Sequence, residues 1–226
     1  MLAAVVGCLL TAHCLGLFST YVLGHNSVKG LVPLFNMDLE QNIPAIVYAA
    51  FFVVGSGGFY ALHRLDRLSP PGSRHWMVLS FLFLFLALDK AIELHGHLTV
   101  PVRSLLGTSG FFYFAWIVPY GAVVAVLSLY LLPRILALPK SIRTLFLLSA
   151  IAYLLGSIVF VGIGGFYGQV YDALSTAEQQ SYPRMLEYDL VATAEDALEF
   201  FGLATLIYAQ ACLLNLRGKD LQIQFR

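Results

Sequence analysis

Six apolar segments of about 20 residues dominate the sequence, and each is long enough to cross the hydrocarbon core of a bilayer as one helix. They cover residues 2–23, 43–62, 76–95, 111–136, 142–166 and 188–216. Inside lipid every backbone amide must be satisfied within its own segment, which favours helices. The sequence therefore predicts an all-α, polytopic membrane protein with six transmembrane helices in a single domain, residues 1–226.

The composition supports this class. Hydrophobic residues make up 59% of the chain and charged residues 12%, whereas about a quarter of the residues in a soluble domain are charged. The formal net charge is zero, and no cluster of Lys and Arg is dense enough to bind along the phosphate backbone of a nucleic acid. No nucleic acid partner is therefore expected. The first segment lacks a basic region before its apolar run and is interpreted as a retained helix, not a signal peptide. The lipid bilayer is the expected partner of the whole chain.

Basic residues fall on one side of this six-span topology. Nine of the 13 lysines and arginines lie in the second loop, the fourth loop and the C-terminal tail: Arg64, Arg67, Arg74, Arg134, Lys140, Arg143, Arg217, Lys219 and Arg226. Short cytoplasmic loops carry the excess of basic residues in membrane proteins. Both termini are therefore predicted to be cytoplasmic, in a multi-pass protein of the inner (cytoplasmic) membrane.

The two long outer loops are half apolar and rich in acidic and aromatic groups. They cover residues 24–42 and 167–187, and Ser175 with Glu178 forms a possible capping box for a short surface helix in the second loop. Such segments lie on the membrane interface or cover the end of a helix bundle. They are also the surfaces through which other membrane protein subunits would dock.

Local signals mark helix ends and close contacts. Asn42 is suited to cap the second span, and Arg217 with Gly218 suits the end of the sixth. Glycines are concentrated at 55–58 in the second span and at 162–165 in the fifth. Small residues at these positions permit close approach of helix backbones.

Charged residues interrupt the end of the third apolar segment. The stretch FLALDKAIELHGH contains Asp89, Lys90, Glu93, His95 and His97. Ionisable groups within a membrane span are costly and are functional candidates by default. The spacing places Asp89, Glu93 and His97 on one helix face if the helix continues that far. If Gly96 ends the helix earlier, His97 turns away and His95 becomes the expected partner of the acids.

The sixth span carries a second acidic group in ATAEDALEFFG. Glu195 and Glu199 are four residues apart and share a helix face, with Asp196 beside them. At 1.5 Å per residue, Asp89 lies about 20 Å along the outward-running third span, and the two glutamates lie about 10 to 17 Å below the outer surface. In a core about 30 Å thick these depths overlap. The two acidic faces are therefore expected to meet in the outer half of the membrane.

Buried carboxylates that lie close together need their negative charge to be neutralised or paired, and this can happen in three ways. A divalent metal (Fe, Mn or Zn) would use the carboxylates and imidazoles of Asp89, Glu93, His95, His97, Glu195 and Glu199. Protonated carboxyl groups would instead form a proton or cation relay. In the third resolution, Lys90 pairs with an acid of the sixth span, and the cluster is a polar lock that fixes helix register.

Three short stretches, NMDLEQNIP, ALDKAIELHGH and AEDALEFFG, carry a resemblance. They resemble an uncharacterised family of bacterial multi-pass membrane proteins with LDE...LHE in the third span and EE.LE..G in the last. Asp89, His95, Glu195 and Glu199 match that pattern, whereas Lys90 and Gly96 stand where acids are expected. The resemblance implies no activity. Both departures remove a candidate ligand, and Lys90 adds a cation that competes with a metal.

Two classes of function follow from these features. The first is a site protein that binds a metal or moves a cation through the cluster near the outer face. The second is a non-catalytic accessory subunit of a larger membrane complex, in which the cluster is the polar lock and the outer loops dock a partner. Catalytic residues are not indicated, because no nucleophile, nucleotide-binding or cysteine motif is present.

Overall fold

Every regular element of the described residues is helical. The computed structural model describes residues 1–66, 73–174 and 186–224, and the elements in chain order are α1 (Leu2–Tyr21), α2 (Leu31–Phe35), α3 (Ile43–Asp66), α4 (Arg74–Ile92), α5 (Leu94–Leu106), the 3-10 turn η1 (Gly110–Phe112), α6 (Ile117–Leu136), α7 (Lys140–Leu154), the π-helical turn η2 (Leu155–Phe160), α8 (Val161–Asp172) and α10 (Leu186–Gln224). Ser175 and Glu178, the expected capping box, lie outside the described residues.

Six helical stretches in these ranges have the length and apolar composition of membrane spans. They are Leu2–Tyr21, Ile43–Asp66, Arg74–Ile92, Ile117–Leu136, Lys140–Asp172 and Leu186–Gly218. The prediction of an all-α chain with six membrane-length helices is therefore confirmed. The fifth of them is one continuous rod in which α7, η2 and α8 follow each other without a break.

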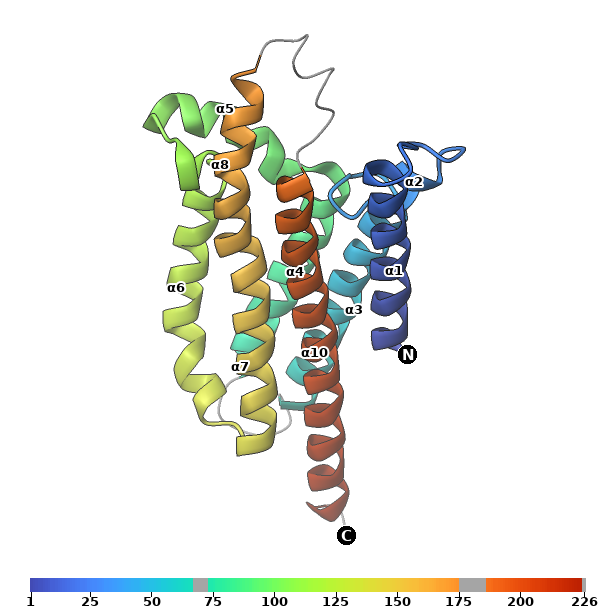
Figure 1. Ribbon diagram of the computed structural model, residues 1–226. Helices are drawn as coiled ribbons and strands as arrows, with labels where there is room; N and C mark the ends of the chain where they lie inside the picture. Colours follow the sequence, from blue (N-terminus) through green and yellow to red (C-terminus); the bar gives the residue numbers. More distant parts are fainter. Residues whose placement is uncertain (67–72, 175–185, 225–226) are drawn as a thin grey trace.

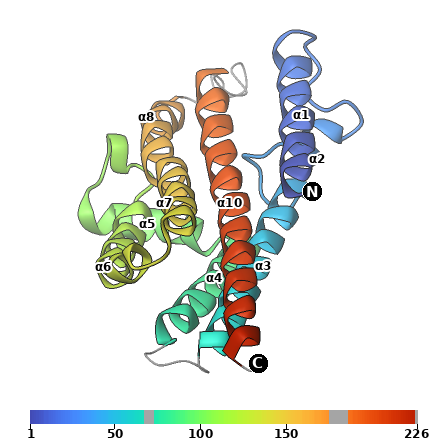
Figure 2. The same ribbon diagram turned by 90° about the horizontal axis from the view of Figure 1, so that it is seen from below.

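The long helices alternate in direction along the chain (Figure 1). The α6–α7 connection and the C-terminus lie at one end of the bundle, and α2, α5 and the end of α8 lie at the other. Viewed along the bundle, α10 is central and α6 lies at the margin (Figure 2). Helix α10 packs against α7 on one side and against α3 on the other, and α3 packs along α4. This arrangement brings the charged end of α4 close to the acidic part of α10.

Aromatic side chains fill the space between α3, α4 and α10. Phe59 stacks on Trp76, with their ring centroids 5.8 Å apart, and Tyr48 packs edge-on against Phe200 at 4.8 Å. By contrast, Ile117 is the one buried residue of α6, a helix that is described in full. Helix α6 therefore directs most of its apolar surface outward, as expected of a helix that contacts lipid.

The predicted helix ends are partly right. The side chain of Asn42 accepts a hydrogen bond from the amide of Ala45 at 3.1 Å, so its role as the cap of α3 is confirmed. The sixth membrane-length span ends at Gly218, next to Arg217 as predicted, but the helix itself does not end there, because α10 continues to Gln224.

Candidate functional site

The chain reverses immediately after the charged end of α4. Helix α4 ends at Ile92, and Glu93 adopts the left-handed conformation with φ 53° and ψ 41° before α5 begins. The conditional prediction that the helix stops early is therefore confirmed, although the break is at Glu93 and not at Gly96. It turns His95 back towards the bundle.

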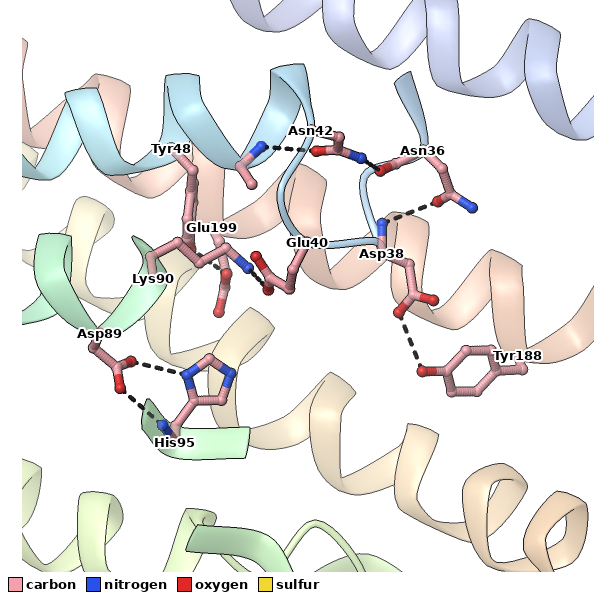
Figure 3. A network of polar contacts seen from close by, with 11 residues as sticks. Asn36, Asp38, Glu40, Asn42, Tyr48, Asp89, Lys90, His95, Tyr188 and Glu199 are labelled. Atoms are coloured by element: carbon pink, nitrogen blue, oxygen red, sulfur yellow. Dashed lines mark hydrogen bonds and ion pairs between the residues drawn. The ribbon is translucent and has the colours of Figure 1, made fainter. Parts of the chain in front are cut away.

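Asp89 holds the chain in place after the break between α4 and α5. The carboxylate is 7% exposed and accepts hydrogen bonds from the amide of His95 at 2.9 Å and the hydroxyl of Tyr120 at 2.7 Å. Its other oxygen lies 2.9 Å from Nδ1 of His95 (Figure 3). Asp89 thus satisfies an amide of the first turn of α5, which has no partner within its own helix. The His95 ring packs edge-on against Trp116, 5.0 Å away.

Lys90 lies on the other side of the same helix end. Its ammonium is 2.5 Å from Oε1 of Glu40 and 5.1 Å from the centroid of the Tyr48 ring. Asp196 and Glu199, on α10, also attract this ammonium group through space. The prediction that Lys90 pairs directly with an acid of the last span is wrong. Its direct ion pair is with Glu40, from the loop before α3.

Three acids of α10 face this group. Glu199 accepts a hydrogen bond from the hydroxyl of Tyr48, on α3, and both side chains are buried. Glu195 and Asp196 lie one turn earlier and interact electrostatically with Glu199. Among the described residues, neither Glu195 nor Asp196 receives a hydrogen bond from a side-chain donor. The acidic part of α10 is therefore short of donors.

The loop between α2 and α3 covers the end of the cluster. Asn42 donates hydrogen bonds to the carbonyl oxygens of Pro33 and Asn36, at 3.1 and 2.5 Å. Asn36 in turn accepts one from the amide of Asp38 at 3.1 Å, and Tyr188 of α10 donates to Asp38 at 3.1 Å (Figure 3). These bonds hold Asp38 and Glu40 over the bundle end. The loop between α2 and α3 therefore contributes to the cluster.

A cavity of about 280 Å³ opens next to the cluster. Its polar lining comes from α4, α5 and α10, through Asp89, Lys90, His95, Glu195 and Glu199. Aromatic rings form much of the remaining wall, from Tyr48, Phe52, Phe85, Trp116, Tyr120 and Tyr153. We name this space the polar cavity. Its volume and lining can hold a small polar group beside carboxylates and against aromatic rings.

The charge of the cluster is unbalanced. Its carboxyl groups are those of Asp38, Glu40, Asp89, Glu195, Asp196 and Glu199, which interact through space with one another or with Lys90 and His95. Even a protonated His95 would leave two positive charges among six carboxyl groups. Oε2 of Glu40 is buried without a hydrogen-bond partner. A buried carboxylate in this state favours the uptake of protons or of another cation.

The six predicted metal ligands separate into two sets. Asp89, His95, Glu195 and Glu199 line the polar cavity, as the overlap of depths predicts, whereas Glu93 and His97 do not. The exposed His97 ring approaches the carbonyl oxygen of Glu93 at 2.7 Å. In the described residues, no three His, Cys, Asp or Glu side chains are placed to hold one metal ion. A site that uses all six residues together is therefore not formed.

Several site residues carry no signal in the sequence. Tyr48 and Tyr120 are ordinary aromatic residues of apolar segments, and Asp38 and Glu40 belong to a loop whose path has no periodicity. Only the loop motif NMDLEQNIP, singled out by the resemblance, points to this contribution. A tyrosine predicted to lie at the same depth in the membrane as a buried carboxyl group is the other available signal. A buried tyrosine hydroxyl needs a hydrogen-bond partner, and the carboxyl group can supply it.

The left-handed backbone at Glu93 yields a first prediction. A non-glycine residue in this conformation costs about 1–2 kcal/mol, so Glu93→Gly is expected to raise the free energy of unfolding by about 1 kcal/mol. Glu93→Ala removes the same carboxylate but keeps the strained backbone, and it should give no such gain. Chemical unfolding of both variants in mild detergent measures the difference. Equal stabilities of the two variants would contradict the backbone explanation.

These features define an α-helical membrane protein with a carboxylate-rich cavity at one end of its bundle. The chain belongs to the family described as "Domain of unknown function (DUF8692)", which matches residues 2–213. Membership of an uncharacterised family is thereby confirmed, and the bacterial origin and the family motifs stay predictions. No curated protein and no solved structure matches the chain.

Proposed function

We propose that the protein spans the bacterial inner membrane six times with both termini in the cytoplasm. The described basic residues that support this orientation lie at helix ends: Arg74 begins α4, Arg134 is near the end of α6, and Arg143 is near the start of α7. These helix ends lie at the same end of the bundle as the C-terminus (Figure 1). The positive-inside rule places that end in the cytoplasm. A C-terminal tag should therefore be protected from protease in intact spheroplasts and cleaved after lysis. Cleavage in the intact cells would overturn the orientation.

We also propose that the polar cavity is a binding site for a cation. The observation that carries this proposal is a shortage of donors in the cavity wall: Glu195 lines the cavity, and its carboxyl group receives no hydrogen bond from a side chain of the described residues. A positively charged group in the cavity would lie beside Asp89, Glu195 and Glu199. The carboxylates are spread around the cavity wall and are not gathered about a point, which suits an ammonium group with several donors better than Fe, Mn or Zn.

Glu195→Gln tests the cation site. Glu195 lines the cavity without a described donor, so the amide should leave the fold intact and weaken cation binding at least tenfold, or about 1.4 kcal/mol. The readout is the stabilisation of purified protein by n-butylammonium, with n-butyrate as the anion of similar size. The exposed Glu187, also on α10, supplies the matched control Glu187→Gln. Equal stabilisation of all three proteins would reject the proposal. Elemental analysis of the same samples separates an organic cation from a bound metal.

A second candidate function is that of an accessory subunit whose cluster is a polar lock. The observation that favours it is that Lys90 with Glu40 and Tyr48 with Glu199 tie α3, α4, α10 and the first outer loop together. An accessory subunit should co-purify with stoichiometric partners after mild extraction. A lower unfolding temperature of Glu195→Gln with unchanged binding of n-butylammonium would also favour this role.

A further inference from the structure

A second cavity continues from the polar cavity towards the opposite end of the bundle. It has a volume of about 270 Å³, and we name it the apolar cavity. The two cavities share the wall residues Phe52, Leu82, Leu86, Val124, Tyr153 and Leu154. They are therefore adjacent cavities along α4, α6 and α7, and a ligand that occupies both must pass these six side chains.

The chemistry of the lining changes from one cavity to the other. The polar cavity presents Asp89, Glu195 and Glu199, whereas the apolar cavity is lined by leucine, phenylalanine and other apolar side chains, with Ser128 and Ser149 as its small polar residues. Both cavities are bordered by α6, from Tyr120 to Ile135. These 16 residues are 15 helical steps and span about 22 Å along α6. That length exceeds half of a hydrocarbon core about 30 Å thick.

The position of α6 gives the two cavities access to lipid. Helix α6 lies at the margin of the bundle in Figure 2 and packs against α7. Its residue Leu132, which lines the apolar cavity, is 45% exposed. In a membrane this exposed surface would face hydrocarbon, so an apolar chain can enter between the helices from the bilayer. A water-soluble cation has no need of the apolar cavity.

From these observations we propose that the two cavities together bind one long-chain amine. The inference rests on the proposed cation site and names its ligand class. The ammonium head lies beside Glu195 and shares the polar cavity with Lys90, whose own charge is paired with Glu40. The hydrocarbon chain lies in the apolar cavity. The unpaired Glu195 carboxylate selects for a cationic head and against the phosphate or carboxylate head of most lipids, because like charges at short distance repel in a medium of low dielectric constant.

The test uses the full chain in its membrane and a photoreactive long-chain amine with a diazirine midway along the chain. Illumination should label peptides of α6 and α7 that line the apolar cavity. Val124→Trp places an indole where the two cavities meet and should reduce this labelling at least fivefold. The matched control is Val126→Trp on the same helix, because Val126 is 67% exposed and lines neither cavity. An excess of the unlabelled amine should compete, and the fatty acid of equal length should not.

The outcomes separate this inference from the cation site itself. Labelling spread evenly over lipid-facing surfaces, or equal labelling of the two tryptophan variants, would overturn the long-chain ligand. If n-butylammonium still stabilises the protein in a manner that depends on Glu195, the cation site stands without it. Labelling that is sensitive to Val124→Trp but unchanged in Glu195→Gln would overturn the choice of an amine head. A purified Val124→Trp protein with the unfolding temperature of Val126→Trp excludes misfolding as the cause.

Discussion

Replacing Lys90 with alanine is expected to lower the free energy of unfolding by about 3 kcal/mol. Lys90 is the ammonium group of the cluster, paired with Glu40 at 2.5 Å and close to Asp196 and Glu199. Removing one partner of a buried pair costs about 3–5 kcal/mol because the remaining charge is left without compensation. The lower end applies here, since 17% of the Lys90 side chain is still accessible. Denaturant titration of the purified protein in mild detergent measures the loss.

Two control variants identify the cause of this loss. Lys140→Ala removes an exposed lysine at the start of α7 and should change stability by no more than about 0.5 kcal/mol. The double variant Lys90→Met with Glu40→Leu removes both charges of the direct pair, and it should be more stable than Lys90→Ala. The recovery should be incomplete, because Asp196 and Glu199 still lack their cation. A Lys90→Ala protein as stable as Lys140→Ala would mean that water screens the cluster.

The sequence predicts those parts of the site that depend on helix geometry. The length of the apolar segments sets the six spans, and the rise per residue brings Asp89 to the depth of Glu195 and Glu199. The cavity lined by all three agrees with that calculation. The number of spans and the shared depth of the three acids could therefore be predicted from the sequence.

Residues placed by tertiary contacts were not predictable in the same way. Glu93 has no propensity for a left-handed backbone, and the break there is held by the hydrogen bonds between Asp89 and His95. Glu40 reaches Lys90 because Asn42 fastens its loop to the bundle. Asn42 was recognised as a helix cap, but nothing in its local sequence shows that the same side chain also sets the path of the loop. The ion pair across the cluster consequently escaped a prediction based on spans alone.

Gly156 is the position where a single methyl group should disturb the site most. It lies in the π-helical turn η2, where a Cβ atom would be 2.7 Å from the carbonyl oxygen of Glu195 and 2.7 Å from Cγ of Glu199. The first of these atoms belongs to the backbone of α10 and cannot rotate away. Gly156→Ala must therefore push η2 and α10 apart, at a cost of about 1–3 kcal/mol.

The same displacement should reach the cation site, since Glu195 and Glu199 move with α10. We expect Gly156→Ala to lower both the free energy of unfolding and the stabilisation by n-butylammonium. Gly57 of α3 is the matched control, because a Cβ atom there has no neighbour within 4 Å. Gly57→Ala should leave cation binding unchanged and stabilise the helix by up to about 1 kcal/mol. If the two alanine variants behave alike, the contact between η2 and α10 is not what sets the geometry of the carboxylates. If Gly156→Ala loses stability and binds n-butylammonium normally, the contact supports the fold but does not position the site.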